Sequence, residues 1–176
     1  MTNNINKVKL IISDIDGVWT DGALYKGGNG LELKKFCVND GAGVAILRQA
    51  GLKLALISGR FSEATAERAA ELKIEDLYNG TINKIPPYNE LKAKYNLSDD
   101  EIAYVGDDII DIPVMNLVGV PIATENACKA CKDAAIYITK KPGGDGAFRE
   151  AVEWILSKQG ILENTLEELR VKVQNN

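Results

Sequence analysis

The residues best suited to chemistry in this sequence are aspartates that follow short apolar runs. Asp14 and Asp16 follow the run 8–13, and Asp107 follows the run 102–105. Two carboxylates about 4 Å apart repel by roughly 4 kcal/mol at an effective dielectric constant near 20, so such a cluster needs a cation. The chain contains no histidine, and oxygen ligands without His or Cys select a hard ion such as Mg²⁺. The further carboxylates available to this site are Asp108 and Asp111.

The same residues suit phosphoryl transfer. Asp14 can attack phosphorus and form an aspartyl phosphate, which divides hydrolysis into two easier steps. Asp16, two residues on, can protonate the leaving alkoxide and later activate water. We expect surrounding negative charge to help Asp16 hold the proton that the first step needs.

Two shorter polar segments complete the set. Ser58-Gly59-Arg60 follows the run 52–57, and Ser58 offers a hydroxyl donor to a phosphoryl oxygen. Lys84 precedes a helical run and offers a point charge to the same oxygens. Singly, each has a simpler interpretation: Asp111 as a turn or helix-cap residue, Lys84 as a surface lysine, and Arg60 as a surface arginine or a partner of the acidic cluster. The order and context of the whole set favour the site.

Composition excludes several classes of protein. The chain has 176 residues, of which 45% are hydrophobic and 26% charged, as in one ordinary globular domain. A net charge of −4 argues against a nucleic-acid partner. No apolar run approaches the roughly 20 residues of a membrane span, so we expect no membrane partner. Without histidine the chain cannot build a Ser-His-Asp triad.

The three cysteines raise a redox alternative. Their odd number, in a chain without a signal peptide, predicts a reducing, cytoplasmic location. Cys128 and Cys131 form a C-x-x-C pattern, which is compatible with a thiol redox protein. The segment 125–135 around them is rich in small residues and favours an ordinary helix.

Strand-like and helix-like segments alternate along the chain. Apolar runs predict strands at 8–13, 52–57, 102–105, 120–123 and 135–138, and helical periodicity is found at 43–50, 63–72, 88–95 and 147–156. This rhythm predicts an α/β fold, a Rossmann-like parallel sheet with helices on both faces. Ligands of such sheets bind beyond the carboxyl ends of the strands, so the polar clusters should converge on one cleft.

The segment 23–36 breaks this rhythm and predicts a protruding β-hairpin with a glycine-rich turn. Its second strand alternates apolar and charged residues, so that neither face is purely apolar. A short amphipathic helix is predicted at 161–170. We therefore expect a single domain over residues 1–160 and a C-terminal tail over 161–176.

The motifs resemble those of a known superfamily. Asp14-Ile15-Asp16-Gly17-Val18, Ser58-Gly59, Lys84 and Gly106-Asp107-Asp108-Ile109-Ile110-Asp111 resemble, in order, the four motifs of the haloacid dehalogenase superfamily. One branch, the phosphatases of 3-deoxy-D-manno-octulosonate 8-phosphate (KDO 8-phosphate), is similar over longer stretches. These include the segments 16–22, 33–36, 39–41, 57–60, 104–108, 113–115 and 143–150.

The resemblance implies an enzyme and a set of roles. Asp14 would be the nucleophile and Asp16 the acid/base, with Mg²⁺ held by the Asp14 side chain, the Asp16 carbonyl and Asp107. Asp108 or Asp111 would support the metal, and Ser58 and Lys84 would hold the phosphoryl group. The substrate would be a sugar-acid phosphate used in lipopolysaccharide precursor synthesis. The family also implies a homotetramer, in which hairpins surround a central axis and C-terminal tails reach neighbouring active sites.

Many relatives cover their site with a cap domain, and this chain has no room for one. The intervals between motifs are residues 17–57 and 85–106, and both are shorter than the roughly 50 residues of the smallest ordinary domains. Because desolvation helps phosphoryl chemistry, a neighbouring subunit is the natural substitute for a cap.

We expect KDO 8-phosphate to be the substrate, although two residues point to different sugar sizes. Trp19 stands where KDO 8-phosphate phosphatases more often have leucine, and it resembles the branch that acts on nine-carbon ulosonate 9-phosphates. Arg60 resembles the eight-carbon branch and can bind a substrate carboxylate through two hydrogen bonds. One alternative is therefore a nine-carbon ulosonate 9-phosphate phosphatase. A second alternative, of another class, is a non-catalytic domain that assists a sugar nucleotidyltransferase.

Overall fold

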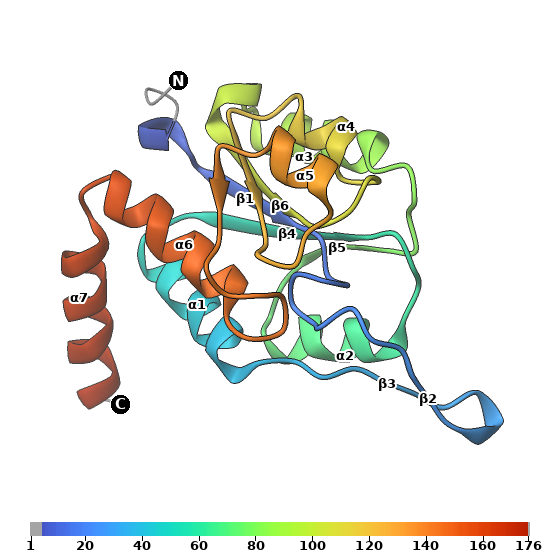
Figure 1. The fold of residues 1–176 in the computed structure, drawn as a ribbon. Coiled ribbons are helices and arrows are strands. Elements are labelled where there is room, and N and C mark those ends of the chain that lie inside the picture. The colour runs from blue at the N-terminus through green and yellow to red at the C-terminus, as the bar shows by residue number, and fades with distance from the viewer. Residues whose placement is uncertain (1–4, 176) are drawn as a thin grey trace.

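Six strands form one parallel sheet in the computed structural model, which describes residues 5–175. They are β1 (Leu10–Ser13), β4 (Lys53–Ser58), β5 (Asp76–Asn79), β6 (Ile102–Gly106), β7 (Val120–Ala123) and β8 (Tyr137–Ile138). Their order is β5-β4-β1-β6-β7-β8, and every neighbouring pair is parallel. The predicted Rossmann-like architecture is confirmed (Figure 1).

The strand order reverses beside β1. From β1 the chain proceeds outward to β4 and β5, then returns to the other side of β1 as β6 and continues outward to β7 and β8. The β1–β6 pairing continues past the end of β1, because the backbone N–H of Asp14 donates to the carbonyl of Val105 at 2.9 Å. A crevice at such a reversal is the usual ligand site of an open parallel sheet.

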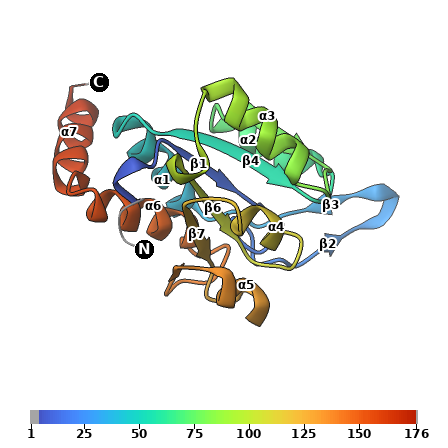
Figure 2. The ribbon, with the colours of Figure 1, turned by 90° about the horizontal axis from the view of Figure 1, so that it is seen from above.

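Helices cover both faces of the sheet (Figures 1 and 2). On one side lie α1 (Val38–Gln49), α2 (Glu63–Glu71) and α6 (Ala147–Lys158), and on the other α3 (Ile85–Tyr95), α4 (Ile112–Met115) and α5 (Lys129–Ala134). Neighbouring residues of one strand serve different cores, since strand side chains alternate between faces. Ile11 packs in the core beneath α1, α2 and α6, which we call the first core, and Ile12 packs in the second core, beneath α3, α4 and α5. Short 3₁₀ turns occur at Ile5–Lys7, Gly28–Gly30 and Asp99–Glu101.

The hairpin extends away from the sheet, as predicted (Figure 1). Its strands β2 (Tyr25–Lys26) and β3 (Glu32–Leu33) are antiparallel and form a sheet of their own. Leu33 is exposed, whereas Glu32 is partly buried. At these two positions of β3 the apolar side chain faces outward and the charged one faces the domain.

The chain after Gly160 forms α7 (Leu162–Gln174), which extends the predicted helix at its C-terminal end. It lies beside α1 and α6, at the opposite end of the molecule from the hairpin (Figure 1). Leu166 and Leu169 pack against the first core, and Gln49 of α1 donates a hydrogen bond to Glu168.

Three features differ from the sequence prediction. Strand β5 and helix α4 were not predicted, because β5 is short and polar and α4 has four residues with a proline near its start. Helix α1 begins at Val38, five residues before the predicted start. Its first turns contain Gly41 and Gly43, residues of low helix propensity. Tertiary packing favours glycine there, since a β-carbon on Gly43 would lie 2.9 Å from the Cα of Arg149 in α6.

The intervals between motifs contain no additional domain in the described part of the chain. Residues 17–57 form the hairpin, α1 and most of β4, and residues 85–106 form α3 and β6. The prediction of a capless fold is therefore confirmed. Within residues 5–175, none of the helices combines the length and apolar character of a bilayer-spanning segment.

Candidate active site

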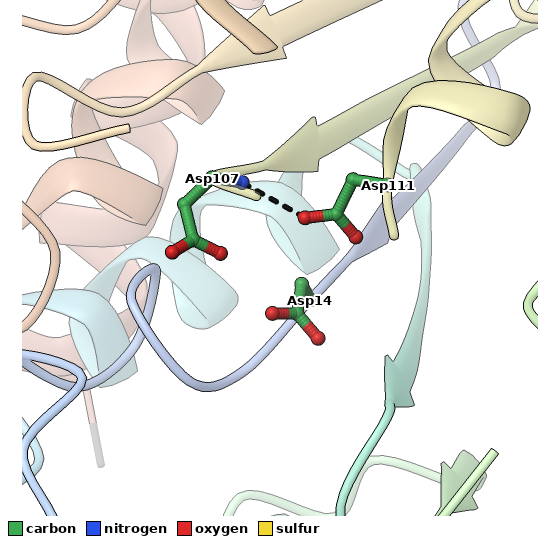
Figure 3. Close-up of side chains that lie close together, drawn as sticks. All are labelled: Asp14, Asp107 and Asp111. Carbon is green, nitrogen blue, oxygen red and sulfur yellow. Dashed lines mark hydrogen bonds between the residues drawn. The ribbon is translucent and has the colours of Figure 1, made fainter. Parts of the chain in front are cut away.

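Three aspartates meet beyond the ends of β1 and β6. Asp14 follows β1, Asp107 follows β6, and Asp111 is four residues further along. One carboxylate oxygen from each can be chosen so that all three lie within 4.8 Å of one another (Figure 3). The predicted convergence of separate strand ends on one site is thus observed.

Lys84 lies inside this cluster. Its Nζ is 2.6 Å from Oδ1 of Asp14 and 2.6 Å from Oδ1 of Asp111, and its side chain is 0% exposed. The interpretation as a surface lysine is therefore wrong. Burial opposes the charged form of the amine, but the two carboxylates outweigh burial and raise the pKa of Lys84 above its ordinary value.

Asp111 organises the surrounding residues. Its Oδ1 accepts a hydrogen bond from Lys84 and another from the hydroxyl of Tyr104, at 2.6 Å each. Its Oδ2 accepts the backbone N–H groups of Asp107 at 2.9 Å and Asp108 at 3.1 Å. Asp111 is wholly buried, whereas Asp108 is exposed and its side chain accepts the N–H of Ile109. Of the two predicted supporting carboxylates, Asp111 is therefore the one built into the cluster.

The electrostatics of the cluster favour a bound cation. Burial, followed by repulsion from Asp111, raises the pKa of Asp14 to about 7. Burial, then repulsion from Asp14 and Asp111, raises the pKa of Asp107 to about 8. These carboxyl groups hold protons that a divalent cation would displace.

The residues present fit Mg²⁺. Oδ1 of Asp107 is buried and has no hydrogen-bond partner among the described residues. This is expected of a carboxylate oxygen that binds a metal ion. Gly17 makes room for this side chain, because a β-carbon at Gly17 would lie 2.0 Å from Oδ2 of Asp107. Gly17 also has φ = +92°, which few other residues adopt. The donors are hard oxygens, which Mg²⁺ prefers.

Asp16 has different surroundings from those expected. Its Oδ1 is 2.6 Å from Nζ of Lys34, on the hairpin, and its Oδ2 is 3.8 Å from Nε of Arg60. The charged groups beside it are cations, so the expectation that negative charge surrounds Asp16 is wrong. The side chain of Lys34, at the base of the hairpin, reaches this aspartate, a contact that sequence distance did not reveal.

The Ser58-Gly59-Arg60 segment borders the same cleft. Ser58 is wholly buried, and its hydroxyl donates to the carbonyl of Arg60 at 2.9 Å. Gly59 meets the 107–111 loop, since a β-carbon there would lie 2.8 Å from Cδ1 of Ile110. The second and fourth motifs are therefore in direct contact.

Arg60 pairs with the hairpin. Its Nη1 and Nη2 bind the two carboxylate oxygens of Glu32 at 2.6 and 3.0 Å. The hydrogen bonds from Arg60, together with that from Lys26, hold the pKa of Glu32 below its ordinary range. The guanidinium of Arg60 thus already binds a carboxylate through two bonds, the geometry expected for a sugar acid.

Trp19, which the sequence linked to sugar size, is a core residue. It is 2% exposed, stacks on Phe148 with ring centroids 4.3 Å apart, and donates its indole N–H to Oγ of Ser13 at 3.0 Å. Packing against Phe148 explains a large aromatic residue at this position.

The cysteine pair lies in an ordinary helix. Cys128 precedes α5 and Cys131 is buried within it, where its thiol contacts the sulfur of Met115 at 3.3 Å. All three cysteines are free. Burial is the main cause that raises the pKa of Cys131, which opposes formation of the reactive thiolate.

Four residues near the site were not assigned roles from the sequence: Glu32, Lys34, Thr65 and Tyr104. The alternation along 31–36 is the signal that could have found the first two, because it places Glu32, Lys34 and Phe36 on one face. Thr65 and Tyr104 carry no such signal, since an isolated hydroxyl in a helix or a strand is common.

A six-stranded Rossmann-like sheet, a carboxylate cluster at its reversal point and a buried lysine define the class of protein. A family model described as haloacid dehalogenase-like hydrolase matches residues 57–150. The chain belongs to this family of hydrolases, in its capless form.

The relatives narrow the class further. A 3-deoxy-D-manno-octulosonate 8-phosphate phosphatase of Escherichia coli is 40% identical over 156 residues, which cover 89% of this chain and 83% of that protein. The crystal structure of a phosphatase of the same name from Yersinia pestis superposes with a TM-score of 0.89 and 40% identity, covering 92% of this chain and 88% of that one. The Moraxella catarrhalis phosphatase, crystallised with a magnesium ion, a phosphate ion and a KDO molecule, has a TM-score of 0.90 and 34% identity, covering 95% and 96%.

Proposed function

We propose that this chain is a Mg²⁺-dependent phosphatase that hydrolyses KDO 8-phosphate to the free sugar acid and phosphate in lipopolysaccharide precursor synthesis. The observation that carries the proposal is the meeting of Asp14, Lys84 and Asp107 beyond two neighbouring strands. The named activity of relatives that are 40% identical along most of the chain supports the choice of substrate.

The proposed reaction has two steps on Asp14. In the first, a carboxylate oxygen of Asp14 attacks phosphorus, the bond from phosphorus to the sugar oxygen breaks, and Asp16 gives that oxygen a proton. In the second, Asp16 takes a proton from water, whose oxygen attacks the aspartyl phosphate. Phosphate then leaves and Asp14 is restored. Asp16, 28% exposed, is the more accessible of the two carboxylates, as a group that exchanges protons with substrate and water must be.

The remaining site residues would bind the phosphoryl oxygens and the metal ion. Nζ of Lys84 lies 2.6 Å from Oδ1 of Asp14, so Lys84 would bind the oxygens of the phosphoryl group that is transferred to this carboxylate. Ser58 and Gly59 border the same region and would contact those oxygens from the β4 side. The Asp14 and Asp107 side chains and the Asp16 carbonyl would hold Mg²⁺, with Asp111 in support. When bound, Mg²⁺ supplies positive charge that offsets the charge of the transferring phosphoryl group.

We assign the substrate carboxylate to Arg60. Its bidentate contact with Glu32 supports this assignment, because a sugar-acid carboxylate can replace Glu32 with the same geometry. The buried position of Trp19 removes the reason to prefer a nine-carbon sugar. A nine-carbon ulosonate 9-phosphate remains the substrate to compare.

We further propose that the protein is a homotetramer in which neighbouring subunits complete each site. Leu24, Leu31 and Leu33 on the hairpin are more than half exposed. A groove of about 1010 Å³ lies between the hairpin and α2, with Phe61 on its border. Apolar side chains beside an open groove suit a protein contact. The free cysteines support a cytoplasmic location.

Phosphate release tests the proposal. The purified protein is assayed with KDO 8-phosphate and with a nine-carbon ulosonate 9-phosphate, each with Mg²⁺ and with a chelator. We expect Mg²⁺-dependent release, faster from the eight-carbon substrate. Asp14→Asn should abolish turnover and keep the fold, while Asp133→Asn, at an exposed carboxylate, should leave turnover unchanged.

Each alternative has its own result. Phosphate release from neither sugar, together with binding to a nucleotidyltransferase, would favour a non-catalytic domain. Loss of activity on alkylation of Cys128 and Cys131 would favour a thiol enzyme. Faster release from the nine-carbon substrate would overturn the proposed sugar while keeping the chemistry.

A further inference from the structure

Lys34 has no assigned role, yet it is among the most buried charged side chains near the site. It follows β3 of the hairpin, and its side chain is 1% exposed. Its Nζ donates to Oδ1 of Asp16 at 2.6 Å and to Oγ1 of Thr65, on α2, at 3.0 Å. Thr65 is itself 1% exposed. The ammonium group is thus held between a catalytic-site loop and a helix.

The neighbours of Lys34 show that this burial is specific. Leu33 and Lys35, on either side, are both exposed. The hairpin therefore leaves an apolar side chain in solvent and buries a lysine, the reverse of the usual preference. Because an isolated buried ammonium is costly, the contact with Asp16 is what makes this position tolerable for lysine.

We propose that Lys34 is a positioning residue for Asp16, an inference that rests on the acid/base role proposed above. Asp16 has two rotatable side-chain bonds and is partly exposed, so its carboxylate needs a fixed partner. The other cation beside it, Arg60, is 3.8 Å away and is already bound to Glu32 by two shorter contacts. Lys34 therefore fixes Oδ1 of Asp16, and Oδ2, 3.8 Å from Nε of Arg60, is the oxygen that we assign to proton transfer.

Both steps of the reaction depend on this placement. Asp16 must lie within hydrogen-bonding distance of the leaving oxygen in the first step and of water in the second. A displacement of about 1 Å in a catalytic group can lower a rate by roughly 100-fold. The hairpin thereby contributes to catalysis within its own subunit, in addition to any contact with a neighbour.

The test compares Lys34→Met, which keeps the length of the chain and removes the ammonium, with Lys35→Met as the matched control on the exposed side of the strand. We expect Lys34→Met to lower kcat on KDO 8-phosphate about 100-fold with little change in KM. Lys35→Met should behave as the wild type, and Lys34→Arg should restore part of the loss. Thermal unfolding monitors the fold of each variant.

An aryl phosphate separates positioning from a general structural defect. With 4-nitrophenyl phosphate the leaving group needs no proton, so only the second step requires Asp16. Lys34→Met should then show a rapid release of about one equivalent of nitrophenolate per site, followed by slow turnover, as the aspartyl phosphate accumulates. A merely structural defect lowers all rates without such a burst.

A double-mutant cycle gives the decisive result. If Lys34 acts through Asp16, adding Lys34→Met to Asp16→Asn causes no further fall in the slow turnover of 4-nitrophenyl phosphate. A further fall as large as that in the wild-type background, or wild-type kcat in Lys34→Met itself, would overturn the proposal. If Lys34→Met does not fold, Thr65→Val, which removes the second partner of Lys34, must produce the burst.

These outcomes are distinct from failure of the proposed function. A wild-type protein that hydrolyses 4-nitrophenyl phosphate and neither sugar phosphate would refute the substrate. The cycle on the aryl phosphate would still decide the role of Lys34.

Discussion

Replacing Lys84 by methionine should destabilise the metal-free protein at alkaline pH. The substitution keeps the length of the side chain and removes the charge from a site that is 0% exposed. At an effective dielectric constant near 20, each contact between opposite charges about 3 Å apart contributes about 5 kcal/mol, most of which desolvation offsets. Removing one partner leaves Asp14 and Asp111 buried without their cation, and the expected loss in unfolding free energy is about 3–5 kcal/mol.

The loss should depend on pH in a defined direction. The pKa of Asp14 is about 7 in the folded protein, above its ordinary value of 3.8. The folded state therefore binds more protons than the unfolded state between these values, and the unfolding free energy falls as pH rises through this range. Without Lys84, whose charge lowers the pKa of Asp14, the Asp14 carboxyl holds its proton to still higher pH. The difference between variant and wild type should thus be small near pH 5 and largest above pH 8.

Urea unfolding followed by circular dichroism, in the presence of a chelator, measures both free energies at each pH. The matched control is Lys129→Met, because Lys129 contacts Asp133 at the same distance of 2.6 Å but is 87% exposed. An exposed pair contributes about 0–1 kcal/mol, so this variant should remain close to the wild type. An equal loss in both variants, or a larger loss for Lys84→Met at pH 5 than at pH 8, would refute the reasoning.

Three further predictions concern the metal and the core. Mg²⁺ must displace protons from Asp14 and Asp107, whose pKa values are about 7 and about 8, so the rise in Tm on adding Mg²⁺ should increase from about pH 6 to about pH 8.5. Differential scanning fluorimetry measures this rise, and a rise that does not depend on pH would contradict the prediction. Gly17→Ala should weaken Mg²⁺ binding in isothermal titration calorimetry, because the new β-carbon displaces Asp107 and the positive φ costs about 1–2 kcal/mol. The control Gly28→Ala, where a β-carbon enters open space, should bind Mg²⁺ as the wild type does. Trp19→Leu should lower the unfolding free energy by about 2 kcal/mol, because packing on Phe148 is lost. The ratio of kcat/KM for the eight- and nine-carbon substrates should stay unchanged, and a changed ratio would place position 19 in substrate selection.

Local sequence was sufficient for most of the fold and for the composition of the carboxylate cluster. Strands such as β1 and β6 are buried on both faces, so they appear as uninterrupted apolar runs. Each run ends in polar residues, and parallel strands bring their carboxyl ends to one edge of the sheet. Asp14 and Asp107 could therefore be placed together although 92 residues lie between them. The absence of histidine narrowed the chemistry further.

Other features depended on contacts between segments that are distant in the sequence. The start of α1, with its poor helix formers, depends on close packing against Arg149 of α6. The choice of Asp111 over Asp108 depends on which side chain turns inward to meet Lys84 and Tyr104.

Strand periodicity and chain direction are local properties, so the residues able to carry phosphoryl chemistry, and their position at strand ends, follow from the amino-acid pattern. How those residues are charged and held depends on the folded chain. Lys34 contacts Asp16 from 18 residues away and Arg60 contacts Glu32 from 28, through a hairpin whose direction no local pattern specifies. Charge interactions depend on distance in space, and folding alone sets that distance.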